Sequence, residues 1–190
     1  MDVQRELVPV VREVCCNQIH KPVKESYLYL TVFVLCCLTA CGQYKTYDQR
    51  LKTLYNNTVP LIHPKQLADA LQADSSFIIL DCREPKEYKV SHLKGAVNVG
   101  YKKFNMDSVK RFSKKATIIV YCTVGYRSEH IGEKLEKAGY LHVDNLYGGI
   151  FEWVNEDYSV YNMQRQRTDS VHAYSHKWGK WLKKGVKVYD

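Results

Sequence analysis

Between residues 58 and 155, short apolar runs alternate along the chain with segments of helical periodicity. Two of the runs, 77–82 and 116–122, are almost continuously apolar, as expected of strands that are buried on both faces. Weaker runs and helical patterns fill the rest of this region; the strands are expected at 58–62, 95–100 and 142–148, and the helices at 64–73, 127–139 and 149–155. Alternating strands and helices predict an α/β fold, with a parallel sheet of about five strands and helices on both faces.

The strongest of these runs ends at a cysteine, Cys122, and the helix at 127–139 follows within a few residues. In parallel α/β sheets, ligands bind beyond the carboxyl ends of the strands. Since the chain has 190 residues, which suits a single domain with one core, this strand end is the expected place for a site.

The loop itself reads Cys122-Thr123-Val124-Gly125-Tyr126-Arg127. A tight loop at a helix N-terminus directs backbone N–H groups inward, and these groups and the helix dipole favour an anion. Gly125 permits the positive φ that such a loop needs. We expect the N–H groups, the dipole and Arg127 to stabilise a Cys122 thiolate, which is a nucleophile. The alternative for an isolated cysteine of this kind is a buried residue that ends a core strand.

The first forty residues have the pattern of a targeting segment rather than that of a folded domain. Residues 28–40 form an apolar stretch that is too short to span a bilayer but has the length of a signal-peptide core. The segment 38–42, Leu-Thr-Ala-Cys-Gly, resembles a bacterial lipobox, which implies cleavage before Cys41 and lipidation of its thiol. Cleavage after Ala40 without lipidation, or a buried apolar strand, are the alternatives. Because residues 1–20 make the charged region unusually long, one hypothesis places the true translation start near residue 20.

The remaining segments flank the predicted domain. Residues 41–57 are polar with scattered tyrosines, which predicts a tether, with room for one helical turn, between the membrane and a domain at 58–158. Residues 159–190 form a C-terminal extension, in which Ser175 is expected to cap a helix that ends at Gly185. Its aromatic face is Trp178, Trp181 and Leu182, and we expect this face to pack on the domain rather than to lie on an anionic membrane.

Charge and cysteine content narrow the function classes. The formal net charge is +8, and all of the excess lies in residues 41–190, since acidic and basic residues balance before them. Such a charge suits small anions, an anionic membrane or nucleic acid, but no nucleic-acid motif accompanies it. The seven cysteines show no CxxC pair and no zinc spacing, and only Cys82 and Cys122 lie in the predicted domain. We therefore predict no metal site and no disulfide framework.

Two stretches together resemble the rhodanese-like domain family. "ILDCREPKEYKVSHLKGAVNVG" (79–100) is similar to the N-terminal signature of that family, and "IIVYCTVGYRSEHIGEKLEKAGYLHVDNLYGGIFEW" (118–153) is similar to its active-site half. The order of the two is correct over roughly residues 58–158. The chain departs from the family pattern at Ser91, where glycine is usual, and in the residues after 158.

The resemblance implies a rhodanese-type sulfurtransferase. Cys122 would take the outer sulfur of a small anionic donor such as thiosulfate, hold it as a persulfide and pass it to a thiol or to cyanide. The backbone N–H groups of residues 123–127 would bind that sulfur, Arg127 would attract the anion, and no metal or organic cofactor would be needed. Asp81 and Arg83 would brace the loop, unless they are strand-end charges in solvent.

Two further residues of the signature are not assigned to the chemistry. By its place in the family pattern, His92 is expected to be structural. Cys82 is expected to be buried packing, with a role as a resolving thiol as the minor alternative.

Two other functions stay open at this point. Many rhodanese-like modules bind or regulate without catalysis, but these commonly lack the cysteine that this chain keeps. Cysteine phosphatases and arsenate reductases also use a cysteine loop closed by arginine. The phosphatase loop has five residues between the two, whereas only Thr123–Tyr126 intervene here. The shorter ring favours a sulfur atom over a tetrahedral phosphate.

The lipobox-like segment near the N-terminus also predicts the localisation. We expect a lipid-anchored protein of a bacterial cell envelope that faces the periplasm or the exterior.

Overall fold

The computed structural model describes residues 46–73 and 76–190. The predicted signal peptide, the lipidated Cys41 and the first part of the predicted tether lie outside the described residues. No helix among the described residues is long and apolar enough to cross a bilayer.

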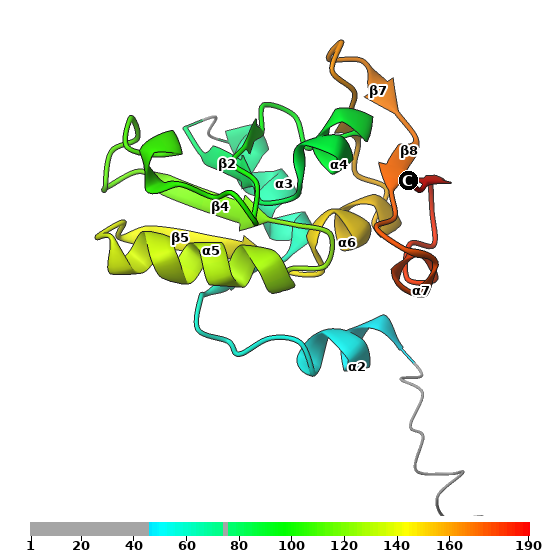
Figure 1. Ribbon diagram of the computed structural model, residues 1–190, viewed down its shortest axis with the longest axis horizontal. Coiled ribbons are helices and arrows are strands. Elements are labelled where there is room, and N and C mark those ends of the chain that lie inside the picture. The colour runs from blue at the N-terminus through cyan, green and yellow to red at the C-terminus, as the bar shows by residue number, and fades with distance from the viewer. Residues whose placement is uncertain (1–45, 74–75) are drawn as a thin grey trace, which may run out of the picture. The chain divides into compact units, whose positions relative to one another are not determined.

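A parallel five-stranded sheet forms the centre of the fold (Figure 1). Its strands are β1 (Leu61–Ile62), β2 (Ile78–Asp81), β3 (Val97–Asn98), β4 (Thr117–Tyr121) and β5 (His142–Leu146), in the spatial order β1-β5-β4-β2-β3. The predicted fold class is thereby confirmed, although each strand is shorter than its apolar run. The outermost strands, β1 and β3, hold only two residues each.

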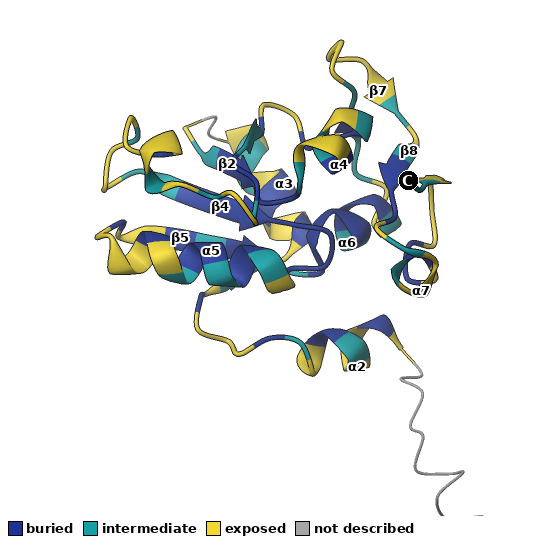
Figure 2. Cartoon of the chain, viewed as in Figure 1, coloured by how far each residue is buried: buried dark blue, intermediate teal, exposed yellow. Residues whose placement is uncertain are grey.

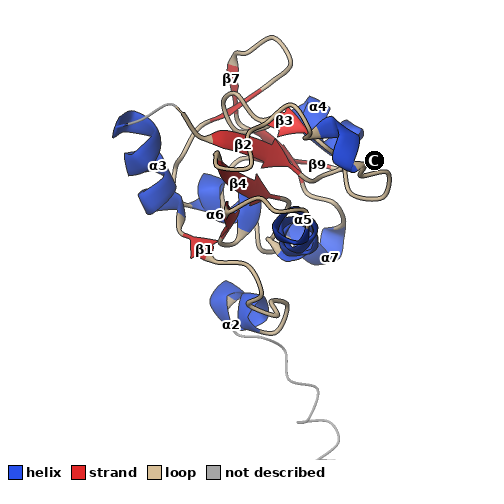
Figure 3. Cartoon of the chain, turned by 90° about the vertical axis from the view of Figure 1, so that its left-hand side faces the viewer, coloured by secondary structure: helices blue, strands red, loops and turns tan. Residues whose placement is uncertain are grey.

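Helices cover both faces of this sheet, as Figure 3 shows. On one face, α5 (Tyr126–Lys137) packs Ile131 and Leu135 against Ile118 and Val120 of β4. On the other face lie α3 (Pro64–Ala73) and α6 (Gly149–Asn155), and the intervening side chain of β4, Ile119, belongs to their cluster. The dark blue of most of β4 in Figure 2 reflects this two-sided cover. A strand covered on both faces is apolar at most of its positions, which is why residues 116–122 show no alternation of apolar and polar side chains.

The register of the two central strands determines where the site lies. β2 pairs with β4 so that Asp81 lies beside Tyr121, and the N–H of Cys82 donates to the Tyr121 carbonyl at 2.8 Å. Both strands therefore end at the same edge of the sheet, and Cys122 is the first residue beyond it. A 3₁₀ turn, η1 (Met106–Ser108), lies in the connection before β4.

The prediction of a tether over residues 41–57 is wrong for its described part. Helix α2 (Tyr47–Lys52) is capped by Thr46, and Tyr47, Leu51 and Tyr55 are buried in the core. The reason is spacing: these three apolar positions recur every four residues, so they share one helical face and its continuation. Because most residues of this segment are polar, its composition did not indicate the short amphipathic helix.

The C-terminal extension folds onto the domain. It contains the hairpin of β6 (Val160–Tyr161) and β7 (Arg167–Thr168), the parallel pair β8 (Ser170–His172) and β9 (Val186–Val188), and helix α7 (His176–Gly179). Leu182 is fully buried, and Trp181 stacks on Tyr47 with ring centroids 5.6 Å apart. The expected packing of the tail is confirmed for these two residues.

The predicted helix up to Gly185 is wrong, because α7 begins after Ser175 as expected but stops at Gly179. The chain then turns so that β9 can pair with β8. Gly185 serves this turn with φ +81°, and a Cβ there would lie 2.7 Å from the Asp169 carbonyl oxygen. The glycine therefore starts a strand rather than ending a helix.

One helix of the domain was not predicted. Helix α4 (Pro85–Val90) has Pro85 in its first turn and a capping box between Glu84 and Glu87. At six residues it is too short for a periodic apolar pattern, so the capping signal alone could have revealed it.

Candidate functional site

The loop from Cys122 to Arg127 curls at the carboxyl edge of the sheet and leads into α5. Gly125 is the N-cap of that helix with φ +91°, in the left-handed region, as the sequence predicted. This turn points the Gly125 N–H at the Cys122 sulfur, with 3.2 Å between N and Sγ. The contact stabilises charge on the sulfur.

Further N–H groups of the loop remain available for a ligand. Within residues 46–73 and 76–190, no protein acceptor is found for the backbone N–H of Val124, Tyr126 or Arg127. The first N–H groups of a helix lack partners inside the helix and form an anion-binding site together with the dipole. The loop thus has the donors that a terminal sulfur atom would need.

Side chains from two segments distant in the sequence hold the loop in this shape. The Tyr55 hydroxyl donates to the Val124 carbonyl at 2.7 Å and accepts from the Gly148 N–H at 2.8 Å. From β5, the Asn145 amide donates to the Gly125 carbonyl at 2.9 Å, and its oxygen accepts from the Ser128 hydroxyl at 2.7 Å. The loop is therefore preorganised, since its carbonyls are fixed before any substrate binds.

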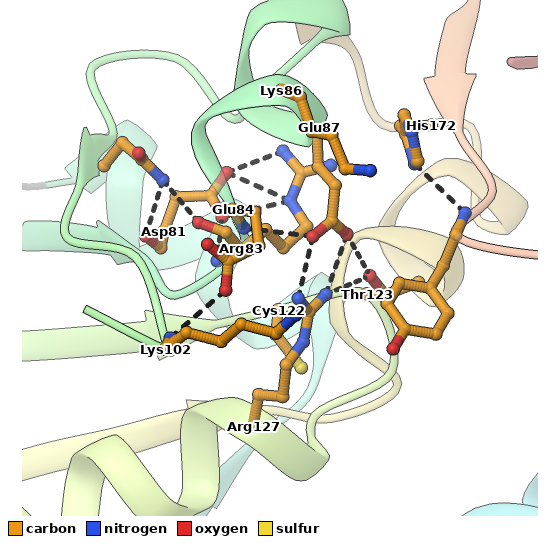
Figure 4. A network of polar contacts seen from close by, with 12 residues as sticks. Asp81, Arg83, Glu84, Lys86, Glu87, Lys102, Cys122, Thr123, Arg127 and His172 are labelled. Atoms are coloured by element: carbon orange, nitrogen blue, oxygen red, sulfur yellow. Dashed lines mark hydrogen bonds and ion pairs between the residues drawn. The ribbon is translucent and has the colours of Figure 1, made fainter. Parts of the chain in front are cut away.

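Arg127 is engaged by a carboxylate that the sequence did not indicate. Its guanidinium forms a bidentate pair with Glu87 of α4, both N–O distances being 2.7 Å, and its Nη2 also donates to the Thr123 hydroxyl at 2.8 Å (Figure 4). Thr123 in turn donates to Glu87 at 3.0 Å. Burial opposes ionisation of Glu87, but the hydrogen bonds and charge of Arg127 outweigh it and lower the pKa of Glu87. The pKa of Arg127 is raised for the converse reason, against its own desolvation.

The ion pair with Glu87 makes the Arg127 guanidinium less available to an anion than the sequence predicted. We expected an available guanidinium that attracts an anion, but Glu87 already balances its charge, and only 14% of the Arg127 side chain is exposed. The contact gives Arg127 a part in closing the loop onto α4. Its part in attracting a donor stays a prediction.

Asp81 and Arg83 form a fully buried ion pair, so the alternative of strand-end charges in solvent is excluded. Arg83 binds both carboxylate oxygens of Asp81 and donates to the Ser91 carbonyl at 2.6 Å. The Tyr121 hydroxyl donates to Asp81 at 2.5 Å. The ion pair therefore fixes Tyr121, the residue before Cys122, and the backbone at Ser91 after α4. It has no direct hydrogen bond to the cysteine loop among the described residues, so it supports the loop through these two neighbours.

His92 and Cys82, which the sequence left outside the chemistry, are both buried. The His92 ring stacks on Tyr88 at 4.0 Å, and its backbone pairs with Tyr161 of β6, which agrees with a structural role. Cys82 is buried beside β4, where burial, followed by the proximity of Cys122, raises the pKa of its thiol. No cluster of potential metal ligands occurs among the described residues.

A pocket of about 600 Å³ opens above Cys122. The predicted residues that line it are Cys122, Thr123, Val124, Tyr126 and Arg127. Other walls come from α4, from the segment after β3, and from the C-terminal extension.

Sequence reasoning missed Glu87, Asn145, Ser128 and Tyr55. Glu87 had the capping-box spacing as a signal, but that spacing predicts a helix and not an ion pair with Arg127. Tyr55 lay in the supposed tether, so nothing marked it as a loop support.

Comparison with known proteins places this site in a family. A profile of the rhodanese-like domain matches residues 63–156. Among curated proteins, the chain is 34% identical over 95 residues to the tRNA uridine(34) hydroxylase of a Streptococcus pyogenes strain, and 35% identical over 95 residues to that of Streptococcus thermophilus. Each alignment covers 47% of this chain but 28% of the relative, so the chain spans less than a third of these relatives' length.

Solved structures agree on the fold. A protein from Bacillus halodurans aligns with a TM-score of 0.51 and 27% identity, over 61% of this chain and 83% of that one. The rhodanese-like domain of an Anabaena protein gives a TM-score of 0.52 at 24% identity, over 57% of this chain and 83% of that one.

Fold and site together define an α/β domain with a cysteine loop between a central strand and a helix. More specifically, residues 63–156 form a rhodanese-like domain, and the chain belongs to the proteins that carry one. The expected family is thereby confirmed. Its match ends before the C-terminal extension.

Proposed function

We propose that the protein is a sulfurtransferase that carries sulfane sulfur as a persulfide on Cys122. The observation that supports this most is the contact of the Gly125 N–H with Cys122 Sγ, in a loop whose other N–H groups are free to receive a second sulfur atom. The pocket above gives a small donor access to this sulfur.

In the loading step, the Cys122 thiolate attacks the outer sulfur of a donor. With thiosulfate, the S–S bond of the donor breaks, sulfite leaves with the bonding electron pair, and the outer sulfur remains on Cys122 as an anionic persulfide. The N–H groups of Val124, Tyr126 and Arg127 hold the charge of that terminal sulfur.

In the discharge step, an acceptor removes this sulfur. Cyanide attacks it, the persulfide bond breaks toward Cys122, and thiocyanate leaves while the thiolate is restored. A thiol acceptor would react in the same way with the protonated persulfide and leave as an organic persulfide. No step changes the total number of electrons, so no external oxidant is required.

The experiment is mass spectrometry of the purified full chain after treatment with thiosulfate or with inorganic polysulfide. We expect one added sulfur atom on the peptide that contains Cys122, and its removal by cyanide. Cys122→Ser should gain no sulfur at this peptide, because a hydroxyl cannot form a persulfide, whereas the matched variant Cys82→Ala should still be loaded.

A non-catalytic binding module remains the second candidate, and the same measurement separates it. If neither donor adds sulfur to Cys122, or if Cys122→Ser still produces thiocyanate from thiosulfate and cyanide, the sulfurtransferase proposal fails. The curated relatives are named as tRNA uridine(34) hydroxylases, and the part that this chain matches is 28% of their length.

For the cellular setting, we propose a lipid anchor on Cys41 that holds the domain at a bacterial envelope membrane. The support is the lipobox-like segment 38–42 after a short apolar stretch. Helix α2 begins at Tyr47, so a lipid on Cys41 would hold the domain close to the membrane surface.

A further inference from the structure

The C-terminal extension supplies a wall of the pocket above Cys122. Its residues at the pocket are Tyr174, Trp178, His172 and Asp190. All four lie beyond residue 156, where the family match ends. This side of the pocket is therefore a feature of this chain in addition to the shared domain.

The extension is fixed at this place by polar contacts. The His172 Nε2–H donates to Asp190 at 3.1 Å, while its Nδ1 accepts from the Tyr174 N–H at 3.1 Å. Asp190 also pairs with Lys86 of α4. These contacts join β8, the C-terminal residue Asp190 and α4 at the rim, so the wall is built into the fold.

The character of the wall is aromatic. Tyr174 is 52% exposed although it is a large apolar ring, and it sits at φ +62°, a conformation that is uncommon for such a residue. Its ring lies over the Arg127 guanidinium, with 5.2 Å from Cζ to the centroid. Tyr101 and Leu54 line the pocket from other segments. Thiosulfate and cyanide have no organic group that could use these surfaces.

The charges at the pocket are balanced. Its lining carries the cations Lys86, Lys102 and Arg127 and the carboxylates Glu84, Glu87 and Asp190. Two of the cations are already paired, Arg127 with Glu87 and Lys86 with Asp190. Within the described part of the chain only Lys102 among the three forms no ion pair. A dianion therefore gains little net attraction here, whereas a single negative charge can be matched.

We propose that the extension forms a subsite for the organic group of the sulfur donor, and that the preferred donor carries its sulfane sulfur on an apolar or aromatic group with no more than one negative charge. Tyr174 and Trp178 contact that group, while the donor sulfur reaches Cys122. This inference rests on the proposed sulfur transfer and refines its substrate. For an organic thiosulfonate, the Cys122 thiolate takes the outer sulfur, the S–S bond breaks, and the sulfinate leaves with the electron pair.

The test compares three donors on the full chain: thiosulfate, methanethiosulfonate and benzenethiosulfonate. The first is a dianion, the second a small monoanion, and the third a monoanion with an aryl group. The rate constant for persulfide formation on Cys122 is measured for each. Because the donors differ in intrinsic reactivity, the readout is the ratio of the benzene to the methane donor, compared between variants.

Tyr174→Asn should lower this ratio by about three- to tenfold, the usual range for one aromatic contact. Asparagine tolerates the positive φ, so the turn should persist. Tyr174→Phe keeps the ring and should keep the wild-type ratio. Leu141→Asn replaces an apolar residue that is 64% exposed and outside the pocket lining, and it should also leave the ratio unchanged.

Each outcome has one meaning. If Tyr174→Asn slows all donors equally, Tyr174 merely positions Arg127 and the subsite is rejected. A wild-type preference for thiosulfate over both thiosulfonates would also reject it. If none of the donors, and no polysulfide, loads Cys122, then it is the proposed function itself that fails.

Discussion

At the residue scale, Glu87 decides the electrostatics of the loop. It is fully buried, yet it accepts hydrogen bonds from Arg127 and Thr123, two of the six residues of the loop. A buried carboxylate is tolerated only when it is paired and hydrogen-bonded, and this one is both. Removing it would leave a nearly buried guanidinium without its partner.

Glu87→Gln should therefore destabilise the protein by about 3–5 kcal/mol, the usual cost of breaking a buried ion pair. Urea unfolding at neutral pH measures this. The matched control is Glu133→Gln, since Glu133 accepts a hydrogen bond from Thr58 on the partly exposed side of α5 and should cost far less.

The same residue gives a pH dependence. Because the pKa of Glu87 is lowered by Arg127 from its usual 4.5, its contribution is complete above that value and is lost as the pH falls through the folded-state pKa. The stability difference between wild type and Glu87→Gln should shrink between pH 6 and pH 3. Parallel pH profiles for the two proteins would contradict this assignment.

At the scale of the element, helix α5 depends on the glycines at its two ends. Gly125 precedes it at φ +91° and Gly139 follows it at φ +87°. Their surroundings differ. A Cβ on Gly125 would lie 2.2 Å from the Tyr55 hydroxyl, whereas a Cβ on Gly139 would meet nothing within 4 Å. The start of the helix is therefore closely packed, and its end is constrained by conformation alone.

Gly139→Ala should cost about 1–2 kcal/mol, the strain of a left-handed non-glycine residue. Gly125→Ala carries the same strain and in addition displaces Tyr55, which supports Val124 and Gly148. We expect it to be clearly more destabilising and to slow the loading of Cys122. Thermal unfolding and persulfide formation are measured on both variants. Equal effects of the two substitutions would show that the contact with Tyr55 is unimportant.

At the scale of the whole molecule, segments on both sides of the family domain complete its core and its site. Helix α2 and the extension meet where Tyr47 stacks on Trp181. Tyr55 supports the cysteine loop, and Tyr174 lines the pocket above it. The functional unit is thus larger than the domain that the comparison recognises.

Deletion of residues 171–190 should lower the melting temperature on the order of 10 °C, because it exposes the surface now covered by Val171, Trp181 and Leu182. Calorimetry of the full and the shortened chain measures this. Since these side chains are packed on the domain, the tail should add no affinity for anionic lipid vesicles. Unchanged stability together with a loss of vesicle binding would instead make the tail a membrane-docking element.

The proposed anchor is tested by labelling growing cells with a radioactive fatty acid. The wild-type protein should carry the label, and Cys41→Ala should carry none, because the lipid is attached through that thiol. Cys37→Ala is the matched control, since this cysteine lies within the same apolar stretch and should leave labelling intact. A label that persists without Cys41, or a wild-type protein that takes up none, would end the lipoprotein proposal.

The order of strands and helices and the place of Cys122 were readable from the sequence. A strand that is buried on both faces is apolar at most of its positions, and a glycine that takes a positive φ before a helix has few substitutes. Both requirements concern residues close together in the chain, so they can be read directly from residues 116–122 and from Gly125. The resemblance to the rhodanese-like domain rests on the same local stretches.

Only the tertiary structure decided what surrounds the loop. Glu87 meets Arg127 forty positions later, Tyr55 reaches Val124 across the sheet edge, and Tyr174 lies at the pocket because β9 returns to pair with β8. No periodic pattern in the sequence indicates these contacts, since each depends on how distant elements pack. The sequence could therefore place the cysteine that we propose as the nucleophile, whereas the charge balance and the walls of its pocket follow from the folded chain.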